Sequence, residues 1–146
     1  MSGQRPLSSE SVHGTTVAID GRAVLITGPS GSGKSDLALR LIDRGFTLVS
    51  DDQTIVRRDG DRLVASAPVQ IAGKLEVRGI GIMEMKTASD VPVALLVELV
   101  SDIPRLPDDG RELPVLGIPL PLIAIDAMTA SAASKVALAL DRFGLK

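Results

Sequence analysis

Residues 28–35 read Gly28-Pro29-Ser30-Gly31-Ser32-Gly33-Lys34-Ser35, and they match the pattern G-x-x-x-x-G-K-[ST] at every defined position. The glycines let the backbone curl so that successive N–H groups point inward, which forms an anion site at the positive end of a helix. Lys34 can reach the β- and γ-phosphates, and the Ser35 hydroxyl can ligate Mg²⁺. The stretch predicts a nucleoside triphosphate site; the alternative is a chance Gly/Ser connection.

The flanking sequence predicts the strand and the helix that a phosphate loop joins. Residues 15–19 and 22–27 are β-branched, apolar segments separated by Asp20-Gly21, a pair typical of a two-residue hairpin. Residues 34–44 carry an apolar helical stripe, Asp36 and Arg40 can pair on its opposite face, and Gly45 predicts its end.

The rest of the chain is predicted from the same patterns. Further strands are expected over residues 46–50, 54–58, 62–66, 91–100 and 122–125, with a hairpin at Asp59-Gly60 and a helix over residues 131–143. Residues 104–121 hold five prolines and predict a loop with little regular structure. Residues 1–11 predict a flexible N-terminal tail, and residues 12–146 a single domain. Pattern alone leaves residues 75–82 undecided.

Composition excludes several classes of protein. With 146 residues and 45% apolar side chains, the chain can bury a core of its own. It has no cysteine and one histidine, which excludes a disulfide scaffold and a thiolate zinc site. A net charge of -2 and only two aromatic residues offer no case for nucleic acid. The N-terminus lacks a signal peptide, and no apolar run could span a bilayer, so we expect a cytoplasmic domain.

An acidic pair, Asp51 and Asp52, follows the strand after the predicted helix. In a βαβ unit this strand would lie in the same parallel sheet as the strand before the phosphate loop, with both ends at one edge. We therefore expect the pair beside the phosphates, where one carboxylate can hold a metal and the other can take a proton. Neighbouring strand residues point to opposite faces, so one of the two can lie outside the site.

Two further features are ambiguous on their own. His13 is placed just before the first predicted strand, where a surface or capping role is the ordinary one. In residues 73–82, Glu76 and Arg78 would share one side of an extended segment, and Gly79 and Gly81 allow close backbone approach. An exposed edge strand explains that segment equally well.

Together these motifs resemble the catalytic domain of the HPr kinase/phosphorylase family. The resemblance spans residues 12–82 and consists of Val12-His13-Gly14, the phosphate loop, Leu48-Val49-Ser50-Asp51-Asp52 and the Leu75-Glu76-Val77-Arg78-Gly79-Ile80-Gly81-Ile82 segment, in that order. It implies an α/β P-loop kinase domain with a mixed sheet and β-hairpins, similar to PEP carboxykinase. It also implies the short single-domain form, because few residues precede His13.

The resemblance assigns roles to particular residues. Residues 28–35, with Lys34, would hold ATP; Ser35 and Glu76, with Asp51, would hold Mg²⁺. Asp52 would be the base that accepts the serine proton, His13 the active-site histidine, and Arg105 the loop arginine that meets the transferring phosphoryl group.

The implied reaction is ATP-dependent phosphorylation of a serine on an HPr-like phosphocarrier of the phosphotransferase system. Phosphorolytic dephosphorylation stays open, because the family's Pro-Val-x-Pro-Gly-Arg-Asn segment has no counterpart here. A homo-oligomer, a hexamer in the family, is implied as well. The alternatives are a P-loop kinase of a small metabolite and a non-catalytic ATP-sensing module.

Overall fold

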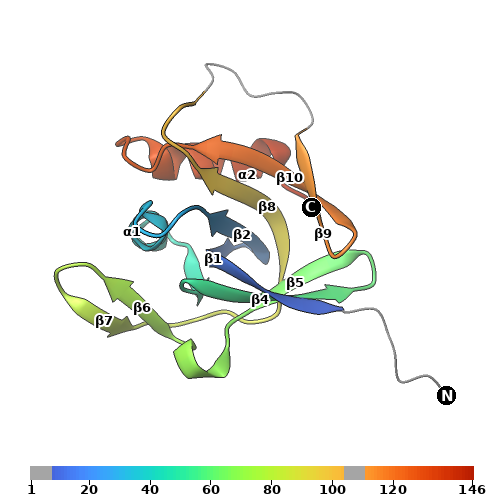
Figure 1. Ribbon diagram of the computed structural model, residues 1–146, viewed down its shortest axis with the longest axis horizontal. Coiled ribbons are helices and arrows are strands. Elements are labelled where there is room, and N and C mark those ends of the chain that lie inside the picture. The colour runs from blue at the N-terminus through green and yellow to red at the C-terminus, as the bar shows by residue number, and fades with distance from the viewer. Residues whose placement is uncertain (1–7, 104–110) are drawn as a thin grey trace.

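The computed structural model describes residues 8–103 and 111–146. Two α-helices and a short 3-10 turn accompany ten strands in these ranges (Figure 1). Their bounds are β1 (Ser9–Ile19), β2 (Arg22–Thr27), α1 (Lys34–Asp43), β3 (Thr47–Ser50), β4 (Gln53–Asp59), β5 (Arg62–Ser66), the 3-10 turn (Val69–Ile71), β6 (Lys74–Val77), β7 (Gly81–Glu84), β8 (Val91–Leu99), β9 (Glu112–Val115), β10 (Ile118–Ile125) and α2 (Ala132–Phe143).

The long strand β1 joins two parts of a mixed sheet. Its first half pairs antiparallel with β4, and its second half pairs antiparallel with β2 on one edge and β3 on the other. Strand β8 begins beside β5 and continues between β2 and β10, both of which run parallel to it. The pairs therefore lead from β1 through β4, β5, β8 and β2 back to β1. The mixed α/β fold with hairpins is confirmed.

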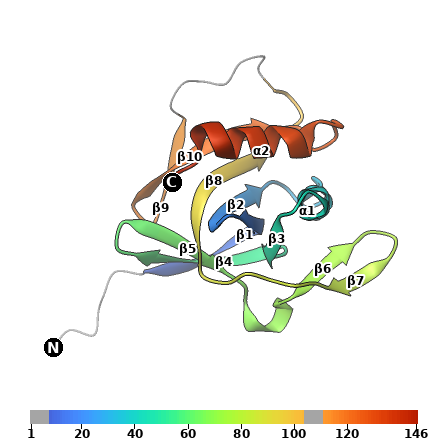
Figure 2. The same cartoon turned by 180° about the vertical axis from the view of Figure 1, so that it is seen from behind.

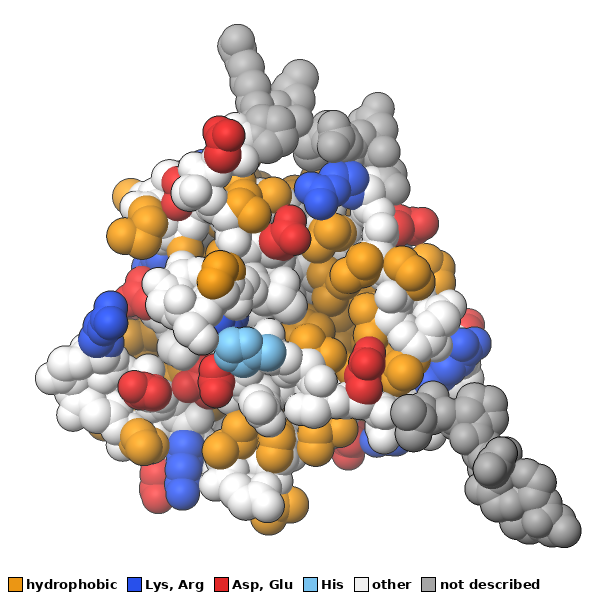
Figure 3. Space-filling view, viewed as in Figure 1, with side chains coloured by type: hydrophobic (Ala, Val, Ile, Leu, Met, Phe, Trp, Pro, Cys, Tyr) orange, Lys and Arg blue, Asp and Glu red, His pale blue; other side chains and the backbone are white. Residues whose placement is uncertain are grey.

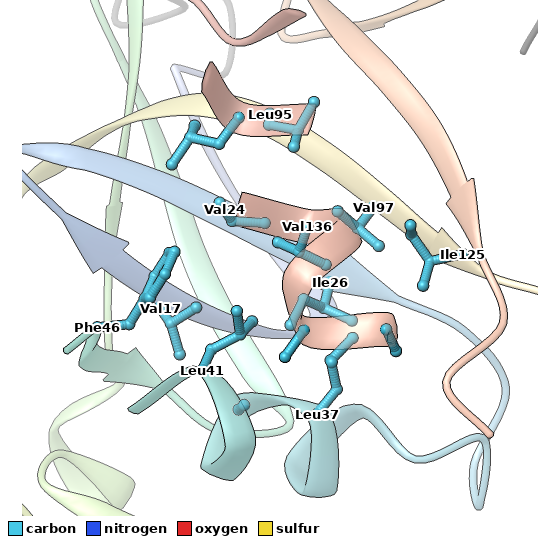
Figure 4. Close-up of a cluster of buried hydrophobic side chains, with 14 of the residues drawn as sticks. Val17, Val24, Ile26, Leu37, Leu41, Phe46, Leu95, Val97, Ile125 and Val136 are labelled. Carbon is cyan, nitrogen blue, oxygen red and sulfur yellow. The ribbon is translucent and has the colours of Figure 1, made fainter. Parts of the chain in front are cut away.

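Apolar side chains on both faces of this sheet form the core. Val24 and Ile26 of β2 pack in one cluster with Leu37 of α1 and Val136 of α2 (Figure 4). The intervening residues Ala23 and Leu25 pack in a second cluster with side chains of β4 and β5. This period-2 alternation is that of a strand covered on both sides. Both helices lie against the first face (Figure 2).

The local predictions near the phosphate loop are confirmed. Asp20 and Gly21 both have positive φ, 53° and 72°, in the two-residue turn between β1 and β2. Asp36 and Arg40 pair at 3.2 Å on the exposed side of α1. The second hairpin also forms, but its turn is Gly60-Asp61, because Asp59 pairs with Arg62.

Three predictions about chain path are wrong. Residues 9–11 are not a tail, because they pair with β4, and His13 consequently lies inside β1. Strand β3 is not a neighbour of β2, because β1 runs antiparallel between them. Part of the expected proline loop, residues 112–121, is the hairpin β9–β10, whose turn has Leu116 and Gly117 at φ 50° and 80°. Prolines fit there because they occupy an edge of the sheet.

No helix among the described residues has the length and apolar character needed to cross a membrane.

Replacing Leu37 with alanine should lower the free energy of unfolding by about 2–5 kcal/mol, because it leaves a cavity between α1 and the sheet. Leu37 is fully buried, whereas Leu138 of α2 is 69% exposed and serves as the control. Urea unfolding followed by circular dichroism measures both variants. Equal losses for Leu37→Ala and Leu138→Ala would contradict this packing.

Candidate active site

The phosphate loop connects β2 to α1 and has the shape that its glycines predict. A Cβ on Gly28 would lie 2.7 Å from the Ser32 hydroxyl oxygen, so a side chain there would collide with the loop. Gly33, at the start of α1, has φ 97°, a conformation that side chains rarely adopt. The backbone N–H of Ser32 donates to the Pro29 carbonyl at 3.0 Å. The loop is therefore tightly curled against the helix N-terminus.

Lys34 and Ser32 provide donors suited to phosphate oxygens. The buried Lys34 ammonium donates to the carbonyls of Gly28 and Pro29, at 2.9 and 3.1 Å. The buried Ser32 Oγ has no hydrogen-bond partner. A buried polar group without a partner is costly, and an incoming anion would satisfy both groups. These residues fit a bound triphosphate.

A cavity of about 650 Å³ opens beside the loop. Its walls include Thr27 and Gly28 on one side, Glu98 and Leu99 at the end of β8, and Asp126 and Met128 after β10. The Arg40 guanidinium holds the last segment against α1, donating to the carbonyls of Ala127 and Thr129 at 2.6 and 3.2 Å. Sequence reasoning did not single out these residues, because nothing in their spacing connects the end of β8 with the loop after β10.

Asp51 is the most connected side chain of the site. It is 7% exposed and follows β3 directly. Its Oδ1 accepts hydrogen bonds from Ser35 Oγ at 2.6 Å and from Thr15 Oγ1 at 3.0 Å, and its Oδ2 accepts one from the backbone N–H of Glu76 at 3.1 Å. The carboxylate thus joins the phosphate loop to β1 and β6.

Asp52 has different surroundings from those of its neighbour. Its backbone is left-handed, at φ 66°, and its side chain is 69% exposed. One carboxylate oxygen lies 3.0 Å from Nε2 of His13, which β1 presents from the strand next to the turn. The histidine is visible on the surface, beside acidic side chains, in Figure 3. The two carboxylates are therefore divided between a buried position at Ser35 and an open position at His13.

The residues expected to hold Mg²⁺ are brought together only in part. Ser35 and Asp51 are in direct contact. Glu76 reaches Asp51 through its backbone N–H, while its side chain is exposed. No group of three His, Cys, Asp or Glu side chains in residues 8–103 and 111–146 forms a metal cluster. A hydroxyl and one carboxylate still fit Mg²⁺, which is usually held by few protein ligands together with phosphate oxygens and water.

The two arginines considered from the sequence have different outcomes. Arg105 lies outside the described residues. Arg78 does not continue the strand with Glu76, because β6 ends at Val77 and the Ile80 N–H turns back to the Val77 carbonyl at 3.0 Å.

One contact residue was missed by sequence reasoning. Thr15 is fully buried, donates to Asp51, and accepts from the Asp52 N–H at 3.1 Å. Threonine is common in strands, so its hydroxyl gave no distinctive signal within residues 15–19.

Comparison with known proteins agrees with this geometry. The family described as "HPr Serine kinase C-terminal domain" matches residues 5–137. The HPr kinase/phosphorylase of Chlorobium limicola is 37% identical over 130 residues, covering 80% of this chain and 39% of its own. That of Ralstonia pickettii is 39% identical over 127 residues, covering 79% of this chain and 39% of its own. The chain therefore spans about two fifths of the length of these curated relatives.

A solved structure is similar over most of the fold. It is the Hpr(Ser) kinase/phosphatase from Coxiella burnetii, with a TM-score of 0.78 and 29% sequence identity. The match covers 91% of this chain and 95% of the other.

Replacing Lys34 with methionine should weaken ATP binding roughly 10- to 100-fold, because a hydrogen bond to a charged group contributes about 1.5–3 kcal/mol. Titration with a fluorescent ATP analogue in the presence of Mg²⁺ measures the affinity. Lys135→Met, at an exposed position of α2, is the control. Unchanged affinity in Lys34→Met would remove Lys34 from the site.

Proposed function

This chain belongs to the HPr serine kinase C-terminal domain family, and on that premise we propose that it transfers the γ-phosphoryl group of ATP to a serine of a small HPr-like phosphocarrier protein. The observation that carries the proposal is the link from Ser35 through Asp51 and Thr15 to Asp52. It puts a candidate base at the same edge of the sheet as the phosphate loop. We propose residues 12–146 as the catalytic unit.

In this reaction the phosphate loop holds and orients ATP. The loop N–H groups and the Lys34 ammonium would exchange their present partners for phosphate oxygens, and the free Ser32 hydroxyl would donate to the same anion. Ser35 and Asp51 would hold Mg²⁺, which neutralises charge on the β- and γ-phosphates. Glu76, on the exposed side of β6, would join them when nucleotide is bound.

The exposed Asp52 carboxylate is the proposed general base. It would accept the proton of the attacking serine as the serine oxygen bonds to the γ-phosphorus and the bond to the β,γ-bridging oxygen breaks. ADP leaves with that bridging oxygen. His13, 3.0 Å from Asp52, would orient the carboxylate. Arg105 is proposed to meet the transferring phosphoryl group.

The reverse direction uses the same groups. By microscopic reversibility, protonated Asp52 would donate to the leaving serine oxygen while inorganic phosphate attacks the phosphoserine, giving pyrophosphate. We propose the kinase direction as the main activity. Because the reaction consumes ATP, we place it in the cytoplasm, and we propose that the chain works as a homo-oligomer.

The direct test is incubation with Mg-ATP and an HPr-like carrier, followed by mass spectrometry. Phosphate on a serine of the carrier supports the proposal. ATP consumption without the carrier, with phosphate on a small metabolite, would replace it with metabolite kinase activity; nucleotide binding without turnover would indicate an ATP sensor.

Replacing Asp52 with asparagine should reduce kcat about 100- to 10,000-fold, because it removes the proton acceptor. ATP affinity should stay near the wild-type value, since the Asp52 side chain points away from the loop toward His13. Asp43→Asn, at the exposed end of α1, is the matched control. Transfer at the wild-type rate by Asp52→Asn would exclude Asp52 as the base.

Incubating the serine-phosphorylated carrier with inorganic phosphate tests the reverse activity. We expect pyrophosphate formation to be slow relative to the kinase reaction, and to disappear in Asp52→Asn because both directions share this residue. Ion chromatography measures the product. Pyrophosphate formation that persists in Asp52→Asn would contradict a shared acid and base.

A further inference from the structure

A single buried hydroxyl contacts both members of the acidic pair. Thr15 is 0% exposed. Its Oγ1 donates to Asp51 Oδ1 at 3.0 Å and accepts a hydrogen bond from the backbone N–H of Asp52 at 3.1 Å. The hydroxyl therefore uses its one proton and a lone pair on two consecutive residues of the turn between β3 and β4.

The pairing register of β1 explains why this residue lies there. On one edge of β1, His13 pairs with Gln53 of β4, whereas Thr16 pairs with Ser50 of β3. Asp51 and Asp52 bridge the gap between those two partners. Thr15 lies at the position where β1 exchanges one partner strand for the other, so its side chain is what β1 offers to the turn.

We propose that Thr15 is a positioning residue for phosphoryl transfer. Its hydroxyl holds the Asp51 carboxylate at Ser35, and it stabilises the left-handed backbone that directs Asp52 toward His13. The proposal rests on the function proposed above for Asp51 and Asp52. It assigns to one threonine the separation of the two carboxylates into a metal-facing and a proton-accepting role.

The chemistry requires a hydroxyl at this position. A φ of 66° is unfavourable for aspartate, and the N–H bond to Thr15 offsets part of that cost. Valine has nearly the same shape as threonine but offers neither donor nor acceptor, so Thr15→Val would leave the Asp52 N–H unpaired and remove one donor from Asp51. Serine keeps both hydrogen bonds and loses only a methyl group.

The chain supplies a matched control in the next residue. Thr16 is also 0% exposed, and its Oγ1 hydrogen-bonds to Thr54 Oγ1 at 2.8 Å, with no contact to the acidic pair among its hydrogen bonds. Thr16→Val therefore removes a buried hydroxyl from the same strand without touching Asp51 or Asp52.

The test compares Thr15→Val, Thr15→Ser, Thr16→Val and the wild type in two measurements. The first is the Mg²⁺ concentration needed for half-maximal binding of a fluorescent ATP analogue, and the second is kcat and KM for phosphorylation of the carrier. Thr15→Val should raise the Mg²⁺ requirement and lower kcat by about 10- to 100-fold, as loss of a residue that orients a metal ligand does. Thr15→Ser and Thr16→Val should stay near the wild type.

Three results would overturn the proposal: wild-type values in Thr15→Val, an equal loss in Thr16→Val, or a loss in Thr15→Ser as large as in Thr15→Val. Thermal melting by circular dichroism shows whether each variant folds. If Thr15→Val does not fold, Thr15→Ser and Thr15→Ala make the same comparison, since both lack the methyl group and only serine keeps the hydroxyl.

Failure of the proposed function gives a different result. A wild-type protein that phosphorylates no carrier would refute the acceptor, while the Mg²⁺ requirement of nucleotide binding would still separate Thr15→Val from Thr15→Ser if Thr15 positions Asp51.

Discussion

The buried carboxylate of Asp51 is the constraint on which the site depends. A buried charge is stable only with hydrogen-bond partners around it, and here the partners come from three separate segments: Ser35 of α1, Thr15 of β1 and the backbone of Glu76 in β6. Satisfying this one group fixes how the helix after the phosphate loop, the long strand and the β6–β7 hairpin meet. The hairpin otherwise extends away from the main sheet (Figure 1).

The left-handed turn at Asp52 gives adjacent residues opposite environments. In a regular strand, neighbours alternate between faces and stay in one layer of the structure. A φ of 66° instead sends Asp52 to the surface at His13 while Asp51 stays buried at Ser35. A buried carboxylate near the phosphates suits metal binding, and an exposed one suits contact with the side chain of another protein. The same turn therefore supports both halves of the proposed reaction.

Features governed by neighbouring residues were predictable. The phosphate loop, α1 and the β1–β2 hairpin follow from glycine conformation, apolar periodicity and Asp-Gly turn chemistry, all of which act over a few residues. The β9–β10 hairpin was not predictable in this way, because its turn places Leu116 at positive φ and its strands contain Pro114, Pro119 and Pro121. Packing at a sheet edge, with Arg58 donating to the Leu116 carbonyl at 2.9 Å, overrides that local preference.

The sequence by itself determined that a phosphate-binding loop exists, which residues form it, and that acidic residues follow the next strand, because each of these is written in a contiguous stretch. Only the tertiary structure decided that β1 lies between β2 and β3, that Asp51 and Asp52 diverge, and that Thr15 joins them. Those outcomes depend on strand order and register. Both are set by burying two apolar faces of one sheet together, and that balance involves residues far apart in the chain.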